Sequence, residues 1–185
     1  MVSDQSGALA SGCRHLMTTQ GASAALDATQ TVDAYRACLL SGRIRSESIH
    51  PSNANDDYHE NLTYIHSGDW ASYKYLSFRE DIRAFCATVG SLIGGGAIEV
   101  HCDHEKGPLL CACEIPNTGG WKMWQQVEAK LQLPVTGIHA IYLVFRGNRG
   151  RLLDLLDFSF NGSNYGTADG NRCRDHARQD TALRP

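Results

Sequence analysis

The chain has 185 residues, of which 42% are hydrophobic and 20% are charged, so it is long enough to bury one core. Its formal net charge is -3, and the arginines near the C-terminus stand among acidic residues. The sequence therefore lacks the basic face that a nucleic-acid backbone requires, and we expect no nucleic-acid partner. No stretch approaches the roughly 18 consecutive apolar residues of a membrane span, so we expect no membrane partner either.

Three regions follow one another along the chain. Residues 1–30 are small, polar and unpatterned, which predicts a mobile N-terminal arm without a signal peptide. Residues 31–161 change to short runs rich in Val, Ile, Tyr and Phe, separated by turn residues, and predict one β-sandwich module. Residues 162–185 are too polar to bury much surface, and we predict a polar C-terminal tail or linker.

The middle region reads as a series of short strands. The two that flank HEKGP predict a hairpin in which Gly107 is available for a positive φ. Residues 123–133 fit a weak amphipathic helix or a strand equally well. A single antiparallel sheet would leave an apolar face in water, so the run of strands predicts an all-β sandwich or barrel. The clearest strands are AIEVHCD (97–103), LLCACEI (109–115), IHAIYLVF (138–145) and LLDLLDFSF (152–160).

Metal-binding and thiol residue types also occur in these strands. The stretch HCDHE, residues 101–105, concentrates metal-ligand types, but alternate strand residues face opposite sides and the stretch leads into the hairpin. We therefore predict solvated turn residues there rather than a metal site. Cys111 and Cys113 lack the C-x-x-C spacing of a redox or zinc motif, so we predict ordinary core or surface thiols.

Four blocks in order resemble the carbohydrate-binding modules of family 6: TYIHSGDWASYKYLSF, GGGAIEVHCD, PNTGGWKMW and GIHAIYLVFRGNRGRLLDLLDFSF. The resemblance covers residues 32–160. It implies a jelly-roll β-sandwich of two antiparallel sheets that binds sugar polymers and has no catalytic machinery of its own. It also implies an extracellular location, a monomer, and a glycoside hydrolase domain as a partner.

The resemblance further implies a cleft in the loops at one end of the sandwich, where two aromatic rings clamp a pyranose and a polar side chain bonds its hydroxyls. The matching residues are Tyr64, Trp121 and Asp154. A pyranose has an apolar C–H face that stacks on an aromatic plane while its hydroxyls reach polar partners, so these residue types suit the task. Asp154 replaces the asparagine of typical members, a change that removes two N–H donors and adds a charge.

The other two tryptophans are predicted to pack. In the family the second tryptophan of the block is directed inward, so the resemblance places Trp124 in the core. Trp70 is also expected to pack, and Tyr73 is expected to lie on the opposite face of the same strand. Because a few family members also bind sugar on the concave sheet surface, Trp70 is the candidate residue for a secondary concave-face site.

The structural calcium site of the family is degraded in this sequence. Asp33 matches one ligand position and Asp157 stands one place after another, whereas Tyr35 and Leu156 replace expected acidic residues. Calcium takes six to eight oxygen ligands, so two carboxylates predict a weak or absent structural calcium site. We expect that no cofactor is required.

Three functions remain open from the sequence. The first is a non-catalytic module that binds a β-linked polysaccharide of the xylan or β-glucan type and targets a glycoside hydrolase. The second is a diverged sandwich that acts as a spacer or protein-interaction module. The third is a small glycoside hydrolase that uses surface carboxylates, although the sequence has no G-x-S-x-G nucleophile elbow for other hydrolase chemistry.

Overall fold

The structure is a computed structural model that describes residues 16–19, 21–49 and 60–162. Within these ranges no helix is long or apolar enough to cross a membrane. The elements, in chain order, are β1 (Leu16–Thr18), β2 (Gly21–Ser23), β3 (Leu26–Asp27), β4 (Val32–Asp33), a 3-10 turn η1 (Ala34–Arg36), β5 (Leu39–Leu40), β6 (Arg45–Ser48), β7 (Glu60–His66), β8 (Trp70–Phe78), β9 (Ile82–Ser91), β10 (Gly96–Cys102), β11 (Leu109–Ile115), β12 (Gly120–Lys130), β13 (Gly137–Arg146) and β14 (Arg151–Gly162).

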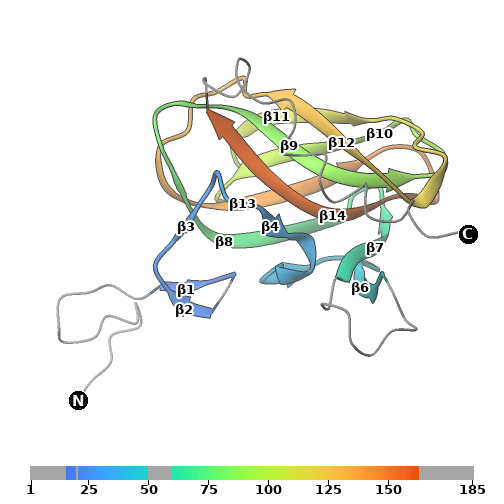
Figure 1. Ribbon diagram of the computed structural model, residues 1–185, viewed down its shortest axis with the longest axis horizontal. Coiled ribbons are helices and arrows are strands. Elements are labelled where there is room, and N and C mark those ends of the chain that lie inside the picture. The colour runs from blue at the N-terminus through green and yellow to red at the C-terminus, as the bar shows by residue number, and fades with distance from the viewer. Residues whose placement is uncertain (1–15, 20, 50–59, 163–185) are drawn as a thin grey trace, which may run out of the picture.

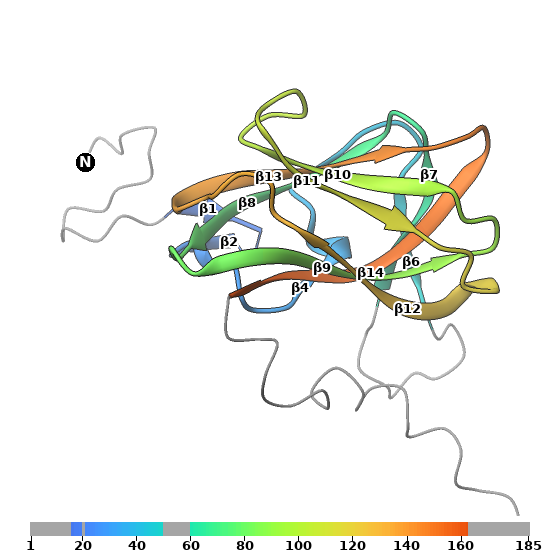
Figure 2. The same cartoon turned by 90° about the horizontal axis from the view of Figure 1, so that it is seen from above.

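Two sheets lie face to face (Figures 1 and 2). The first has the strand order β11-β10-β13-β8-β3, and β5 also pairs with β8. The second has the order β12-β9-β14-β7-β6, and β4 also pairs with β14. Neighbouring strands are antiparallel, except that β3 runs parallel to β8 at the edge of the first sheet. The predicted jelly-roll β-sandwich is confirmed.

Aromatic rings pack against one another between the two sheets. Phe158 on β14 meets Tyr73 of the opposite sheet edge-on, with ring centroids 4.6 Å apart, and lies 5.9 Å from Phe85 on the neighbouring strand. Such pairs stabilise beyond the apolar area that they bury. Tyr73 is fully buried, and its hydroxyl donates to the carbonyl of Ala34 at 2.7 Å. The core therefore contains a phenol without leaving its polar group unpaired.

The folded part of the chain begins earlier than the sequence predicted. Strand β3 extends the first sheet, and Ala28 after it is fully buried. The amide of Ala28 donates to the carbonyl of Ser77, and its carbonyl accepts from the amide of Phe160. Because an edge strand leaves backbone groups unpaired, a passing segment can bind there. This corrects the C-terminal end of the arm that was predicted over residues 1–30. The tail predicted over residues 162–185 lies outside the described residues, apart from residue 162 at the end of β14.

Strand pairing settles two local predictions. The stretch that fitted a helix or a strand is strand β12, which pairs with β9. The hairpin between β10 and β11 is confirmed, but its positive φ of 63° falls on Asp103 rather than on Gly107. Gly107 is required for another reason, since a Cβ there would lie 1.9 Å from the carbonyl oxygen of Cys102.

Replacing Phe158 with alanine should lower the free energy of unfolding by about 3–5 kcal/mol, because the change opens a cavity between the two sheets. Urea denaturation followed by circular dichroism measures this loss. Met123→Ala is the matched control, because the Met123 side chain is 60% exposed and should change stability by no more than about 0.5 kcal/mol. Equal stability of the two variants would show that the ring contacts across the core contribute little.

Candidate functional site

A buried carboxylate lies near the start of β14. Asp154 is fully buried, and Nη2 of Arg151 donates to both of its oxygens, at 2.5 and 2.6 Å. The Thr63 hydroxyl donates to Oδ1 at 2.9 Å, and Lys122 Nζ lies 3.9 Å from Oδ2. Burial raises the pKa of Asp154 above its usual value, and the hydrogen bonds from Arg151 and Thr63 offset part of that rise. The carboxylate thus holds the Arg151 guanidinium in one place.

Two aromatic rings flank this guanidinium. Cζ of Arg151 lies 4.3 Å from the ring centroid of Trp121 and 5.1 Å from that of Tyr64. A second guanidinium, that of Arg45 on β6, lies 3.7 Å from the Tyr64 centroid. All three guanidinium-to-ring distances are in the range of cation–π contacts. The structure therefore brings the three predicted residues Tyr64, Trp121 and Asp154 together and adds two arginines that the sequence analysis missed.

Tyr64 reaches the site because β7 is irregular where it pairs with β14. Ile65 is opposite Leu153 and Leu62 is opposite Leu155, so two residues of β7 stand against one of β14. Tyr64 lies within this bulge, has a φ of 56° and is 38% exposed, whereas both of its neighbours are buried. The bulge turns one aromatic ring out of the strand's ordinary alternation.

Trp121 is positioned by a rigid turn rather than by a regular ladder. Gly119 has a φ of 91°, and its amide donates to the Asn117 side chain at 2.8 Å. The Thr118 hydroxyl donates to the carbonyl of Gly120 and accepts from a backbone amide of β9. A Cβ on Gly90, which lies opposite on β9, would come within 2.2 Å of the Trp121 carbonyl oxygen. The Gly-Gly corner thus fixes the backbone and leaves the indole half-buried at the surface.

An open hollow continues from this cluster. It has a volume of about 360 Å³ and is lined by His66, Ser67 and the β13–β14 connection, residues 147–150. His66 is the register partner of Arg151 in the backbone pairing of β7 with β14, so the hollow borders the start of β14. Its volume lies at the low end of the range of small-molecule sites, about 300–1,000 Å³.

Asp154 differs in detail from its predicted role. The sequence predicted a carboxylate that accepts hydrogen bonds from sugar hydroxyls, but Arg151 and Thr63 cover its oxygens. The polar group that faces the two rings is instead the guanidinium. No simple spacing rule could have found this pair, because residues three apart on a regular strand face opposite sides. Only the register shifts of β14 against β7 bring the two side chains together.

The other two tryptophans lie outside this cluster. Trp124 is half-buried and does not belong to the buried core, so the prediction that it packs inward as a core residue is wrong. The cause is the irregular pairing of β12 between Gly120 and Gln125, which breaks the alternation. Trp70 is half-buried and contacts Tyr142 at 5.5 Å on the first sheet, with Tyr73 in the core on the opposite face, as predicted. The role of Trp70 in a concave-face site stays a prediction.

The residues at the expected calcium position do not fit that ion. Asp33 and Asp157 are register partners on β4 and β14, so the two carboxylates come from neighbouring strands. Oδ2 of Asp33 is bound by Nε of Arg36 at 3.0 Å. A guanidinium at this carboxylate occupies the place that a cation needs, and two carboxylates fall far short of six to eight oxygens.

The buried thiols agree with the sequence. Cys111 and Cys113 are free and buried, both in the core cluster. Burial raises the pKa of Cys111 to about 12 and that of Cys113 to about 11. Both are ordinary core thiols, as predicted.

The fold and this cluster define a class of protein: a small β-sandwich that displays aromatic rings and a polar group at the end of one sheet. The family model of the carbohydrate binding module (family 6) matches residues 44–162, and the chain belongs to this family.

The relatives of the chain include larger enzymes that share this region and isolated modules of the family. It is 41% identical over 102 residues to an arabinoxylan arabinofuranohydrolase of Paenibacillus polymyxa, and the match covers 54% of this chain but 16% of that enzyme. A β-1,3-glucan-binding family 6 module of Bacillus halodurans has a TM-score of 0.67 at 30% identity, with 75% of this chain and 99% of that one covered. A family 6 module from Clostridium cellulolyticum in complex with xylose has a TM-score of 0.66 at 30% identity, with 73% and 98% covered.

Arg151→Ala should lower the free energy of unfolding by about 3 kcal/mol, since it leaves the Asp154 carboxylate buried without its main counter-charge. The double variant Arg151→Ala/Asp154→Asn should recover part of this loss because it removes the charge as well. Urea denaturation measures both. Arg149→Ala, an exposed arginine two residues away, is the control and should change stability by less than about 0.5 kcal/mol. A single variant as stable as this control would contradict the inferred role of the pair.

Excess calcium should leave the melting temperature unchanged relative to EGTA. A tight site in the presence of calcium at one hundred times its dissociation constant would raise the free energy of unfolding by about 2.7 kcal/mol. In a protein of this size that corresponds to a rise of roughly 5 °C or more, which differential scanning calorimetry resolves easily. Such a rise would show that backbone oxygens complete a calcium site around Asp33 and Asp157.

Proposed function

We propose that the chain is a non-catalytic module that binds a β-linked polysaccharide, of the xylan or β-glucan type, between Tyr64 and Trp121. One observation carries the proposal. Two aromatic side chains, brought from different strands by two separate irregularities, converge on one guanidinium at the start of β14, the middle strand of the second sheet. Packing the two rings into the core would need neither irregularity, whereas exposing both rings at one place on the surface needs both.

The chemistry of the cluster suits a sugar. The apolar face of a pyranose stacks on Tyr64 or Trp121, and each ring contributes on the order of 1 kcal/mol. Arg151 has five N–H donors, and the pair with Asp154 leaves some of them for ring or hydroxyl oxygens of a sugar. Asp154 therefore acts in the proposed site by positioning Arg151. The covered carboxylate also favours binding over hydrolysis, because a glycosidase needs an accessible pair of carboxyl groups.

The relatives support the choice of polymer. One solved family 6 module binds a β-1,3-glucan, another was solved with xylose, and an enzyme that shares this region acts on arabinoxylan. We therefore propose that the module brings a glycoside hydrolase domain close to its polysaccharide outside the cell, where tethering raises the effective concentration of the enzyme at its substrate. In this role the module works as a monomer and needs no cofactor.

Affinity electrophoresis of the 185-residue chain through gels that contain xylan, mixed-linkage glucan, laminarin or agarose tests the proposal. We expect one of the xylan or glucan gels to retard the chain. Trp121→Ala and Tyr64→Ala should each weaken binding about fivefold or more, and the double variant should run as in a gel without polymer.

Met123→Ala is the control, because it removes an exposed apolar side chain two residues from Trp121. It should be retarded like the wild type. Unchanged mobility of the wild-type chain in every gel would favour a spacer or protein-interaction module. Release of reducing sugar from any of the polymers would instead support a small glycoside hydrolase.

A further inference from the structure

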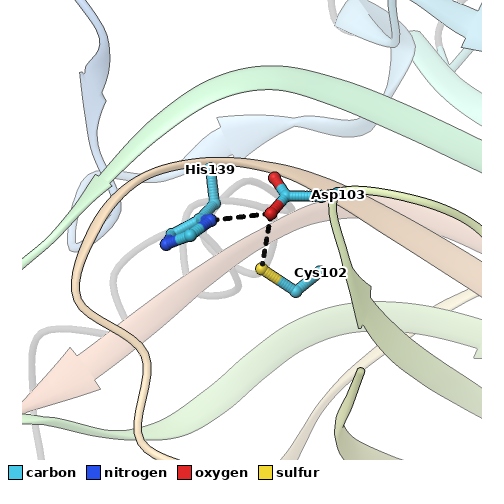
Figure 3. A group of neighbouring side chains, drawn as sticks. All are labelled: Cys102, Asp103 and His139. Atoms are coloured by element: carbon cyan, nitrogen blue, oxygen red, sulfur yellow. Dashed lines mark hydrogen bonds and ion pairs between the residues drawn. The ribbon is translucent and has the colours of Figure 1, made fainter. Parts of the chain in front are cut away.

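A second cluster of chemically versatile side chains lies on the first sheet. Cys102 ends β10, Asp103 follows it, and His139 stands near the start of β13. Their sulfur, oxygen and nitrogen atoms all lie within 4.8 Å of one another. Figure 3 shows the Asp103 carboxylate between the imidazole and the thiol. None of these residues belongs to the Tyr64–Trp121 cluster, which is built on strands of the second sheet.

The sequence predicted solvated turn residues in this segment, which holds for the exposed Asp103 and His104 but not for the first two residues. His101 and Cys102 are buried, with exposed fractions of 9% and 7%. The third donor, His139, is 36 residues further along the chain and reaches Asp103 because β10 and β13 are neighbours. Alternate residues of β10 face opposite sides, so that strand alone cannot bring three donors together. The neighbouring strand β13 supplies the third donor, His139.

The Asp103 carboxylate is held in a fixed direction. The backbone of Asp103 has a φ of 63°, and its amide donates to the carbonyl of Ala140 at 2.8 Å. Oδ1 accepts from the amide of Ala140 at 3.1 Å. Oδ2 is left for the other two side chains and lies 2.9 Å from Nδ1 of His139 and 3.5 Å from Sγ of Cys102. The two hydrogen bonds with Ala140 therefore restrict the carboxylate to one orientation.

The imidazole is oriented for metal binding. Nε2 of His139 lies 2.9 Å from the carbonyl oxygen of Thr136. A carbonyl only accepts hydrogen bonds, so Nε2 carries a proton. In neutral histidine, Nδ1 then has a lone pair that faces the carboxylate of Asp103, which is also an acceptor. When the imidazole is protonated the contact is an ion pair. A metal ion that takes the place of the Nδ1 proton leaves Nε2 on its backbone carbonyl, which is the usual second partner of a metal-bound histidine.

We propose that Cys102, Asp103 and His139 bind a zinc ion. Sulfur, nitrogen and carboxylate oxygen are the ligands that zinc prefers in proteins. With bonds of about 2.0–2.3 Å, a tetrahedral zinc ion holds its ligand atoms roughly 3.5 Å apart. The oxygen–sulfur distance already has this value, and the nitrogen–oxygen distance must open by roughly half an ångström.

The site has one open side. The side chain of Asp103 is 59% exposed and that of His139 is 29% exposed, so the ion enters there and releases the displaced thiol proton to solvent. Three protein ligands leave the fourth position to water. This arrangement is that of an accessible zinc site rather than of a closed structural one.

Titration of the reduced, metal-free chain with Co²⁺ tests the proposal, because cobalt takes the same ligands as zinc and reports on them spectroscopically. We expect a saturable thiolate-to-cobalt charge-transfer band in the near ultraviolet, which added Zn²⁺ abolishes. Cys102→Ser should remove the band. His139→Gln and Asp103→Asn, which change exposed or half-exposed groups, should weaken cobalt binding at least tenfold.

Two matched variants control for other sites. Cys38→Ser removes an exposed thiol, and His104→Gln removes an imidazole next to the cluster. Both should bind cobalt like the wild type, and circular dichroism verifies that each variant is folded. A wild-type chain without a saturable band would overturn the proposal. So would an equally strong band in His139→Gln or Cys102→Ser, since cobalt would then bind elsewhere.

Discussion

A carboxylate buried inside the sandwich needs a counter-charge, and the Asp154–Arg151 pair that provides it sets the geometry of the candidate sugar site. A lone buried carboxylate is strongly destabilising, so the guanidinium has to fold back over the start of β14. In this position it contacts the rings of both Tyr64 and Trp121. The aspartate in place of the family's asparagine is thus accompanied here by a guanidinium, which brings N–H donors to the site.

The core and the site follow opposite rules of strand geometry. Tyr73, Phe145 and Phe158 lie in the core, on the inward side of the alternation that strand residues follow. Each of the two displayed rings depends on a break in that alternation, a bulge on β7 and a longer irregularity on β12. Bulges re-aim side chains at the cost of ladder hydrogen bonds. The sandwich can carry these breaks because the aromatic packing between the sheets comes from β8, β9 and β14 rather than from β7 and β12.

This division explains how much the sequence could predict. Period-two patterns and turn residues are local, so they predicted the strands, the sandwich and the β10–β11 hairpin. The family blocks predicted which aromatic residues meet. Arg151 and His139 could not be found in this way. Arg151 meets the rings of Tyr64 and Trp121, and His139 meets Asp103, through strand pairing that no local pattern encodes. For the same reason the docking of Ala28 was missed, since its hydrogen bonds go to Ser77 and Phe160, far along the chain.

The two proposed sites occupy opposite ends of β13. His139 stands near the beginning of this strand, and the hollow beside the sugar cluster is lined by the connection that follows its end. Seven residues at 3.3 Å each separate His139 from Arg146, a distance of about 23 Å. No residue is shared, and coupling between sites requires an element whose equilibrium both ligands shift. A packed strand in the middle of a sheet is a poor candidate for such an element. Zinc should therefore stabilise the folded chain by mass action while the affinity for polysaccharide stays constant.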